Sequence, residues 1–226
     1  MMDSVEKKRL ESDATMRSVY DIRVLVVGPG FQYLKMFYDA GFRGATTIKE
    51  ADLICFTGGA DVDPVYYGEE VVPGTYTNPA RDAVESIIYA EALSLQKAMV
   101  GICRGSQFLN VMNGGKLWQD IGQHGGRNHN VVHVPTGESK FNMTSTHHQQ
   151  MRPGKDGIVL ALAEESLYKK AQHETVTRLA PELDDVEVVW YPDSLCLCFQ
   201  PHPEFGHGDC RNYFLELVDE YILPAC

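Results

Sequence analysis

Residues 99–105 read Met-Val-Gly-Ile-Cys-Arg-Gly, an apolar run that ends at a cysteine with a glycine two positions away on each side. A side chain displayed at a sharp strand-to-helix turn needs such neighbours, because a Cβ at either position would collide with the folded backbone. The next segment has apolar residues at 108, 109, 111 and 112 and stops at Gly114-Gly115, as a short helix does. The pattern predicts a strand, a tight turn and a helix, with Cys103 at the helix N-terminus.

Cys103 has two interpretations. As a nucleophile, it would benefit from the helix dipole and from free N–H groups, which favour the reactive thiolate. As a structural residue, it would simply be buried, since free cysteine is among the most buried residue types. A base elsewhere in the chain is needed to decide between them.

Predicted strands and helices alternate along the first half of the chain and indicate an α/β fold. Strands are expected over 22–27, 52–56 and 99–102, and helices over 31–40, 81–97 and after Cys103. The helix over 81–97 is expected to be amphipathic, with apolar residues at 84, 87, 88, 92, 93 and 95. This order predicts a mostly parallel sheet that is covered on both faces.

The second half is richer in predicted strands, so antiparallel additions to the sheet are expected there. These strands and a closing helix are expected over 130–134, 140–145, 157–162, 186–191, 195–200 and 210–222. No repeat, low-complexity tract or Pro/Ser-rich linker marks an internal boundary. We therefore expect a polar tail over 1–20 and one domain over 21–226.

The composition disfavours several classes of protein. With 226 residues and 44% hydrophobic content, the chain can bury a sizeable core. Its net charge of −11 disfavours binding to nucleic acid or to an anionic membrane surface. The longest apolar runs have the length of strands, so no membrane span is expected. The charged N-terminus lacks the apolar core of a signal peptide, which favours a cytoplasmic location.

The six cysteines predict reduced, structural thiols rather than a disulfide framework. They stand at positions 55, 103, 196, 198, 210 and 226. Cys196-Leu-Cys198 is compatible with a metal site, but its spacing better fits two side chains on one face of a buried strand. His124, His129 and His133 are also compatible with a metal cluster. Because neither cysteines nor dense carboxylates accompany them, a polar loop is favoured and no metal is expected.

Functional residues of open α/β sheets gather at the carboxyl ends of the strands. Three such ends carry candidate chemistry: Thr57-Gly-Gly-Ala-Asp-Val-Asp-Pro64, the turn at Cys103, and Gln200-Pro-His-Pro-Glu-Phe205. His202 is a candidate base and Glu204 a candidate carboxylate to orient it, because residues two apart in an extended segment project to the same side. The prolines that flank the histidine stiffen this segment.

Acyl transfer also needs hydrogen-bond donors for a tetrahedral oxyanion. The backbone N–H groups of Gly58-Gly59 and of Arg104 are candidates, because the glycines carry no side chain and Arg104 directly follows the cysteine. Each motif alone has a simpler explanation, namely a solvated histidine and glutamate, or a Gly-Gly that only forms a turn. Together they favour a nucleophilic Cys103 with His202 and Glu204 as its partners.

These motifs, taken together and in this order, resemble the class I glutamine amidotransferase superfamily. The γ-glutamyl-γ-aminobutyrate hydrolase branch, which is peptidase C26-like, resembles the chain most closely. The resemblance covers residues 22 to 220 approximately. Besides the three strand ends, it rests on Pro79-Ala-Arg-Asp82, Gly114-Gly-Lys-Leu-Trp-Gln-Asp120 and Ser145-Thr-His-His-Gln149.

The resemblance implies a flavodoxin-like three-layer α/β sandwich with Cys103, His202 and Glu204 as the catalytic triad. It implies an oxyanion hole formed by the amides of Gly59 and Arg104. It further implies that the γ-glutamyl pocket is lined by Gly58, Gln107, Ser145, His147, His148 and Gln149. The implied reaction is thiolate attack on a γ-glutamyl amide, release of an amine or ammonia, and hydrolysis of a γ-glutamyl thioester. This chemistry needs neither a metal nor an organic cofactor.

Two functions compete under this resemblance. The first is a free-standing hydrolase of a small γ-glutamyl substrate, and the second is a glutaminase subunit that supplies ammonia to a separate synthetase. A homodimer is a further candidate assembly, and a binding protein without activity is disfavoured because all three triad members are present.

The chain departs from the family pattern at two places. Pro201 stands before the histidine where the family usually has an aromatic residue, and the stretch from 120 to 145 is shorter than in the hydrolases. Both departures concern the shape of the pocket, and they leave the identity of the leaving amine open.

Overall fold

The computed structural model describes residues 19–121, 126, 128–164, 185–205 and 208–226. Most of the tail expected over 1–20 lies outside these residues, as does His124. The described chain begins with a 3-10 turn, Val19–Asp21, and enters the first strand two residues later.

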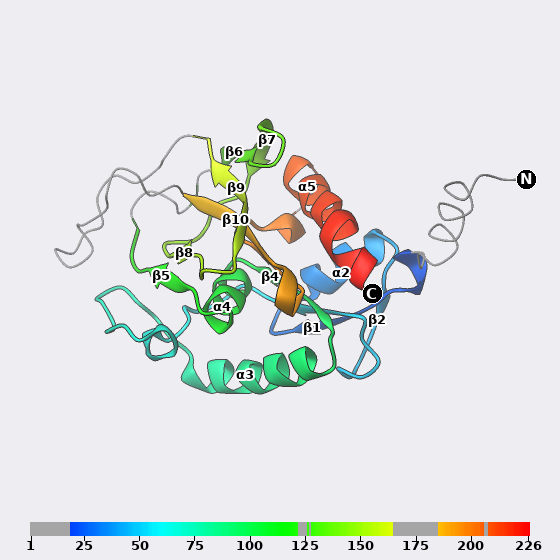
Figure 1. Ribbon diagram of the computed structural model, residues 1–226, viewed down its shortest axis with the longest axis horizontal. Coiled ribbons are helices and arrows are strands. Elements are labelled where there is room, and N and C mark those ends of the chain that lie inside the picture. The colour runs from blue at the N-terminus through cyan, green and yellow to red at the C-terminus, as the bar shows by residue number, and fades with distance from the viewer. Residues whose placement is uncertain (1–18, 122–125, 127, 165–184, 206–207) are drawn as a thin grey trace, which may run out of the picture.

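A nine-stranded sheet forms the centre of the molecule, in the order β2-β1-β3-β4-β11-β10-β9-β6-β7 (Figure 1). The five strands from β2 to β11 are parallel, and the remaining four are antiparallel additions. The bounds are β1 Arg23–Val27, β2 Arg43–Gly44, β3 Leu53–Phe56, β4 Ala98–Ile102, β6 His129–His133, β7 Glu138–Met143, β9 Ile158–Ala163, β10 Val186–Tyr191 and β11 Cys196–Phe199. The expected α/β class, with antiparallel strands in the second half, is confirmed.

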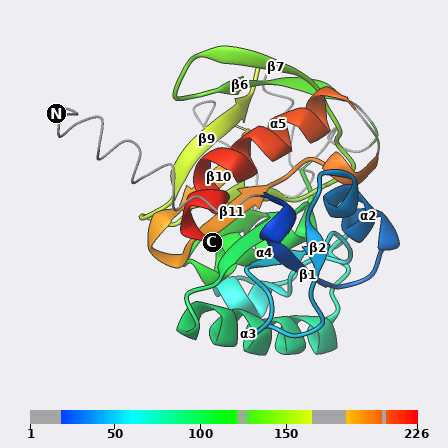
Figure 2. The same cartoon turned by 90° about the vertical axis from the view of Figure 1, so that its right-hand side faces the viewer.

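Helices cover both faces of the sheet, as predicted. Helices α2 (Phe31–Asp39) and α5 (Asp209–Leu217) lie on one side, and α3 (Pro79–Ser94) and α4 (Arg104–Met112) lie on the other (Figures 1 and 2). Each side has its own buried cluster: Phe37 and Phe214 pack with Val100 on one face, and Phe108 packs with Phe56 on the other. The last helix continues as a π-helical turn over Val218–Ile222.

The remaining elements are short. A two-stranded sheet pairs β5 (Lys116–Trp118) with β8 (Gln150–Arg152), and neither of these strands nor β2 is signalled by the sequence. Four more 3-10 turns span Pro64–Tyr67, Pro192–Ser194, Pro203–Phe205 and Leu223–Ala225. No helix within the described ranges is both long and apolar enough to cross a membrane.

The amphipathic pattern expected for the helix over 81–97 is only partly confirmed, because Ala92 is buried and Ile88 packs against the core while the other apolar residues are exposed. Helix α3 starts at Pro79, after Asn78 whose side chain accepts a hydrogen bond from the Arg81 N–H, and it ends at Ser94. Its inner face carries Asp82 and Glu85, while Val84 and Ile87 are 57% and 69% exposed. The reason is a buried guanidinium beneath the helix, which needs carboxylate partners more than the core needs two apolar side chains.

The cysteines behave as the sequence predicts. All six thiols are free, and β11 places Cys196 and Cys198 in one apolar cluster and Leu197 and Phe199 in the other. Burial raises the pKa of Cys196 to about 11, so this thiol stays protonated and inert.

The strand expected over 130–134 is confirmed as β6, and the polar loop expected at His129 and His133 is wrong, because both residues belong to this strand. His129 pairs with the buried Glu187 at 3.2 Å, and Nδ1 of His133 lies 2.8 Å from the Tyr213 hydroxyl. Within the described part of the chain, no group of three or more His, Cys, Asp or Glu side chains is arranged to hold a metal ion.

Candidate active site

Cys103 occupies a sharp turn between the buried strand β4 and helix α4. Its backbone is left-handed, with φ of 52° and ψ of −113°, a conformation that costs a non-glycine residue of the order of 1–3 kcal/mol. The flanking glycines are sterically required. A Cβ at Gly101 would lie 2.3 Å from the Gly105 carbonyl oxygen, and a Cβ at Gly105 would lie 2.1 Å from that of Phe56. The strand-turn-helix predicted from the sequence is therefore present.

His202 and Glu204 are buried and bonded to each other, with 2.6 Å between Nδ1 and Oε1. The extended segment expected here is wrong, because Pro203–Phe205 forms a 3-10 turn. The tight turn, rather than the alternation of a strand, returns the carboxylate toward the imidazole. Burial lowers the pKa of His202, but its interactions with Cys103 and Glu204 outweigh burial and raise that pKa to about 10.

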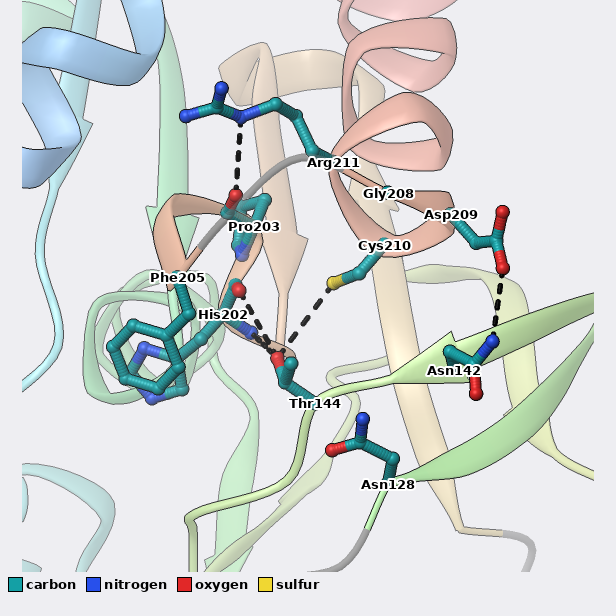
Figure 3. Close-up of a pocket in the computed structure, with 10 residues that line it drawn as sticks. All are labelled: Asn128, Asn142, Thr144, His202, Pro203, Phe205, Gly208, Asp209, Cys210 and Arg211. Carbon is teal, nitrogen blue, oxygen red and sulfur yellow. Dashed lines mark hydrogen bonds between the residues drawn. The ribbon is translucent and has the colours of Figure 1, made fainter.

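The ring and the backbone of His202 are each held by a residue to which sequence reasoning assigned no role. Phe205 stacks on its ring with centroids 4.4 Å apart and planes 3° apart. The Thr144 hydroxyl accepts a 2.7 Å hydrogen bond from the His202 N–H and lies 3.1 Å from the His202 carbonyl oxygen. Figure 3 shows Thr144 between this backbone and the thiol of Cys210, beside a cavity of about 260 Å³. Only the resemblance pointed to this region, through the neighbouring Ser145.

The loop after β3 lies against both Cys103 and His202. A Cβ at Gly58 would lie 3.1 Å from Cε1 of His202 and 3.6 Å from Cβ of Cys103. The Gly58 N–H donates a 3.1 Å hydrogen bond to the hydroxyl of Tyr33, a buried residue of α2. Burial and the neighbouring Glu204 raise the pKa of Tyr33 well above its usual range. Tyr33 thus binds the glycine loop at a position near the carboxylate of the His-Glu pair.

A cavity of about 130 Å³ opens beside Cys103. Gly59 and Arg104 line it, and neither of their backbone N–H groups donates a hydrogen bond among the described residues. The other expected pocket residues divide into two groups, since Gln107, His147, His148 and Gln149 line the cavity whereas Gly58 and the buried Ser145 do not. The cavity is also lined by Ala60, Asp61 and Thr146, which belong to the motifs quoted from the sequence but were assigned no role, and by Tyr76, which lies outside those motifs.

Hydrogen bonds fix the wall of the cavity. Gln107 Nε2 donates to the Gln149 carbonyl oxygen at 3.1 Å and to Oε1 of Gln200 at 3.2 Å. Nδ1 of His147 lies 2.9 Å from the same Gln149 oxygen.

His148 stands at the cavity between two carboxylates. Its Nε2 lies 3.1 Å from Asp61, and its Nδ1 lies 3.8 Å from Asp120. The hydrogen bond to Asp61 is the main reason why the pKa of His148 is raised above its usual value. The small cavity beside Cys103 is therefore lined by polar side chains that are fixed by hydrogen bonds.

A buried ionic network ties the two loops of the site to helix α3. The Arg104 guanidinium is 1% exposed and pairs with both Asp82 and Glu85. Glu85 also pairs with Nε of Arg81 at 2.6 Å, and Oδ2 of Asp82 accepts a 3.0 Å hydrogen bond from the Asp63 N–H. The sequence marked Pro79 to Asp82 only through the family resemblance and assigned these side chains no role.

The profile of the peptidase C26 family matches residues 39–203 of the chain. This chain belongs to the peptidase C26 family. The glutamine amidotransferase-like protein YvdE of Lactococcus lactis is 33% identical over 165 residues, which are 68% of this C26 chain and 66% of that protein. A Mycobacterium tuberculosis protein with the provisional name glutamine amidotransferase is 32% identical over 186 residues, 74% of this chain and 54% of that protein. The chain thus matches between about half and two thirds of these relatives.

A solved structure agrees with the fold. A glutamine amidotransferase from Thermotoga maritima superposes with a TM-score of 0.56 at 16% identity, over 88% of this C26 chain and 84% of that chain. The flavodoxin-like α/β fold implied by the sequence motifs is therefore confirmed, and so is the resemblance to the class I glutamine amidotransferases.

Proposed function

We propose that this C26 chain hydrolyses a γ-glutamyl amide through a γ-glutamyl thioester on Cys103. The observation that carries the proposal is that Cys103 shares one cavity with the backbone N–H groups of Gly59 and Arg104, neither of which donates a hydrogen bond among the described residues, while the His202–Glu204 pair lies beside Cys103 at the Gly58 loop. These are the parts that acyl transfer needs: a nucleophile, an oriented base and an oxyanion site. Membership of the peptidase C26 family supports the same reaction class.

In the first half-reaction, the Cys103 thiolate attacks the γ-carbonyl carbon, and the carbonyl oxygen takes the negative charge. The N–H groups of Gly59 and Arg104 bind that oxygen. Protonated His202 gives its proton to the amide nitrogen, the C–N bond breaks, and the amine leaves. Glu204 stabilises the charged imidazole through Nδ1, which leaves Nε2 to serve the reacting atoms.

In the second half-reaction, water attacks the thioester and His202 takes its proton. The C–S bond breaks, glutamate leaves, and the thiolate and the imidazolium are restored. The size of the cavity supports a small substrate: about 130 Å³ is below the ≈ 300–1,000 Å³ typical of pockets for drug-sized ligands. We therefore propose that the γ-glutamyl group alone enters the cavity and that the leaving amine faces its mouth.

The test is glutamate release by the purified full chain from glutamine and from a panel of γ-glutamyl amines. Acid quenching followed by mass spectrometry should find the γ-glutamyl adduct on Cys103. Cys103→Ala should abolish both signals. Cys226→Ala removes a thiol at the end of the chain and should preserve both. Turnover by Cys103→Ala at the wild-type rate would refute the proposal.

A second function, supply of ammonia to a synthetase, is supported by the names of the two relatives. The two functions differ in what the isolated chain can do. Fast release of glutamate by the chain alone, with a preference for a γ-glutamyl amine over glutamine, supports the hydrolase. Slow glutaminase activity that rises when a separate synthetase is added supports the ammonia donor.

A further inference from the structure

We propose that Arg81 is a positioning residue that fixes the Gly58–Gly59 peptide plane, so that the Gly59 N–H faces the substrate oxygen beside Cys103. The inference rests on the proposed function, because it assigns a role within the same oxyanion site. Arg81 does not line the cavity, and it acts through the loop that it holds.

The Arg81 side chain binds two successive carbonyl groups of this loop. Nη1 donates to the Gly58 oxygen at 2.9 Å, and Nη2 donates to the Thr57 oxygen at 2.8 Å. Nη2 also lies 3.2 Å from Oγ1 of Thr57, and Nε is paired with Glu85 at 2.6 Å. Every nitrogen of the guanidinium is therefore engaged, and its planar fork fixes the direction of both carbonyls.

The direction of a carbonyl decides the direction of the next N–H. A trans peptide is planar, so the Gly58 carbonyl and the Gly59 N–H point in opposite directions. With its oxygen held by Arg81, the peptide must present its N–H away from the guanidinium. A peptide between two glycines rotates more readily than any other, because neither residue has a Cβ to restrict it. Rotation by half a turn would present an oxygen instead of an N–H to the substrate oxyanion and would repel it.

The loop has room for this guanidinium only because glycines surround it. A Cβ at Gly59 would lie 2.2 Å from Nη1 of Arg81, and a Cβ at Gly28 would lie 2.8 Å from Nη2.

The hydrogen bond from Arg81 to the Gly58 oxygen also strengthens the Gly59 N–H as a donor. A cationic donor on the carbonyl oxygen polarises the amide, and hydrogen bonds in such a chain strengthen one another. The Gly59 N–H is thereby both oriented and made a better donor.

Glu85 connects this clamp to the second oxyanion donor. Its carboxylate binds Arg81 through one oxygen and the side chain of Arg104 through the other. The backbone N–H of Arg104 is the second donor at the cavity that makes no hydrogen bond within the described part of the chain. One carboxylate on α3 therefore holds both halves of the oxyanion site at a fixed separation.

The experiment compares Arg81→Met and Arg81→Lys with the wild type, with Arg152→Met as the control. Arg152 pairs with Glu69 at 2.9 Å and lies over Trp118, away from the loop. Loss of one oxyanion donor costs 10²–10³ in kcat, and a misoriented donor should cost less, so we expect kcat to fall about 10- to 100-fold in Arg81→Met. KM should change little, and Arg81→Lys should recover part of the rate because one cation can still reach one carbonyl.

Two reagents distinguish a misoriented Gly59 N–H from a wider disturbance of the site around Cys103. The aldehyde 5-oxopentanoate would add to Cys103 as a hemithioacetal whose oxygen needs the oxyanion site, whereas alkylation of Cys103 by iodoacetamide does not. Arg81→Met should weaken aldehyde binding by the same factor as kcat and leave the alkylation rate within about twofold. Arg152→Met should change neither.

The proposal is overturned if Arg81→Met leaves both kcat and aldehyde binding unchanged. It is also overturned if the rate of Cys103 alkylation falls by the same factor as kcat. If Arg81→Met does not fold, the proposal is overturned when kcat and aldehyde binding show no recovery in Arg81→Lys. The proposed function can fail separately. If the wild type binds the aldehyde but releases no glutamate, the hydrolase proposal falls and the aldehyde comparison still tests Arg81. If the wild type binds no aldehyde, both proposals fall.

Discussion

The hydroxyl oxygen of Tyr33 accepts a 3.1 Å hydrogen bond from the backbone N–H of Gly58. Tyr33 also lies at Glu204, whose charge is the second cause, after burial, of the raised pKa of the tyrosine. One side chain from α2 therefore holds the loop next to Gly59 and lies near the carboxylate that is bonded to His202. Arg81 holds the same loop from the opposite helical layer.

Removal of the Tyr33 hydroxyl should lower kcat and, to a lesser extent, the free energy of unfolding. In Tyr33→Phe the buried Gly58 N–H loses its acceptor, which should cost about 1–3 kcal/mol of unfolding free energy. Displacement of the loop should lower kcat by about tenfold or more. Urea denaturation and steady-state kinetics measure the two effects. Tyr38→Phe, at an exposed position of the same helix, should change neither, and equal kinetics in both variants would contradict the role of Tyr33.

Folding stability should fall in alkaline solution because of His202. Its pKa is raised from 6.5 to about 10, so the folded protein holds this proton more tightly than the unfolded chain does. The resulting stabilisation is complete below about pH 6.5 and is lost as the pH rises toward about 10. Urea denaturation over this window should show the decline. Cys103→Ala removes one interaction that raises the pKa of His202, so its stability should decline less over the same window. A wild-type stability that does not change with pH would contradict the raised pKa of His202.

Alanine at either glycine of the elbow should disrupt the turn. In Gly101→Ala and Gly105→Ala the new Cβ meets backbone atoms at 2.3 and 2.1 Å, and backbone cannot swing away as a side chain can. We expect a loss of 1–3 kcal/mol or more in unfolding free energy for each, measured by urea denaturation. Gly44→Ala is the control, because its Cβ meets only the hydroxyl end of the exposed Tyr38. Wild-type stability of Gly105→Ala would show that the turn is looser than described.

The buried carboxylates of α3 should matter more than any surface pair. Asp82→Asn leaves the Arg81 and Arg104 cations facing the single charge of Glu85, and breaking a buried pair in this way costs about 3–5 kcal/mol. Lys35→Ala breaks the exposed pair with Asp39 and should cost at most about 1 kcal/mol. The comparison is made by chemical denaturation of the two variants. Similar losses in both would mean that Arg104 finds water or another acceptor.

The sequence contains enough information to predict the elbow, the contact of His202 with Glu204 and the position of Cys103 near this pair. Glycines two residues on either side of Cys103 have a local steric meaning, and alternation of strands and helices brings the three strand ends to one edge of the sheet. Local patterns could not predict Tyr33, because a tyrosine in an amphipathic helix has the same pattern whether it packs in the core or bonds a distant loop.

The burial of two carboxylates on the inner face of α3 was also beyond the reach of local sequence patterns. Hydrophobic periodicity treats Asp82 and Glu85 as solvent-facing, and only the position of the Arg104 guanidinium makes their burial favourable. That position is a tertiary fact, set by where α4 starts. His202 and Glu204 show the converse: their contact was predicted, but the conformation that produces it is a 3-10 turn, since Pro203 fits the first position of such a turn.

The left-handed backbone at Cys103 means that the protein carries its proposed nucleophile at the position where folding alone would favour glycine. Under the proposed function, activity and stability therefore oppose each other at one residue. Cys103→Gly would relieve the backbone and remove the thiol, so the chain would gain stability by losing the group that the proposed reaction needs.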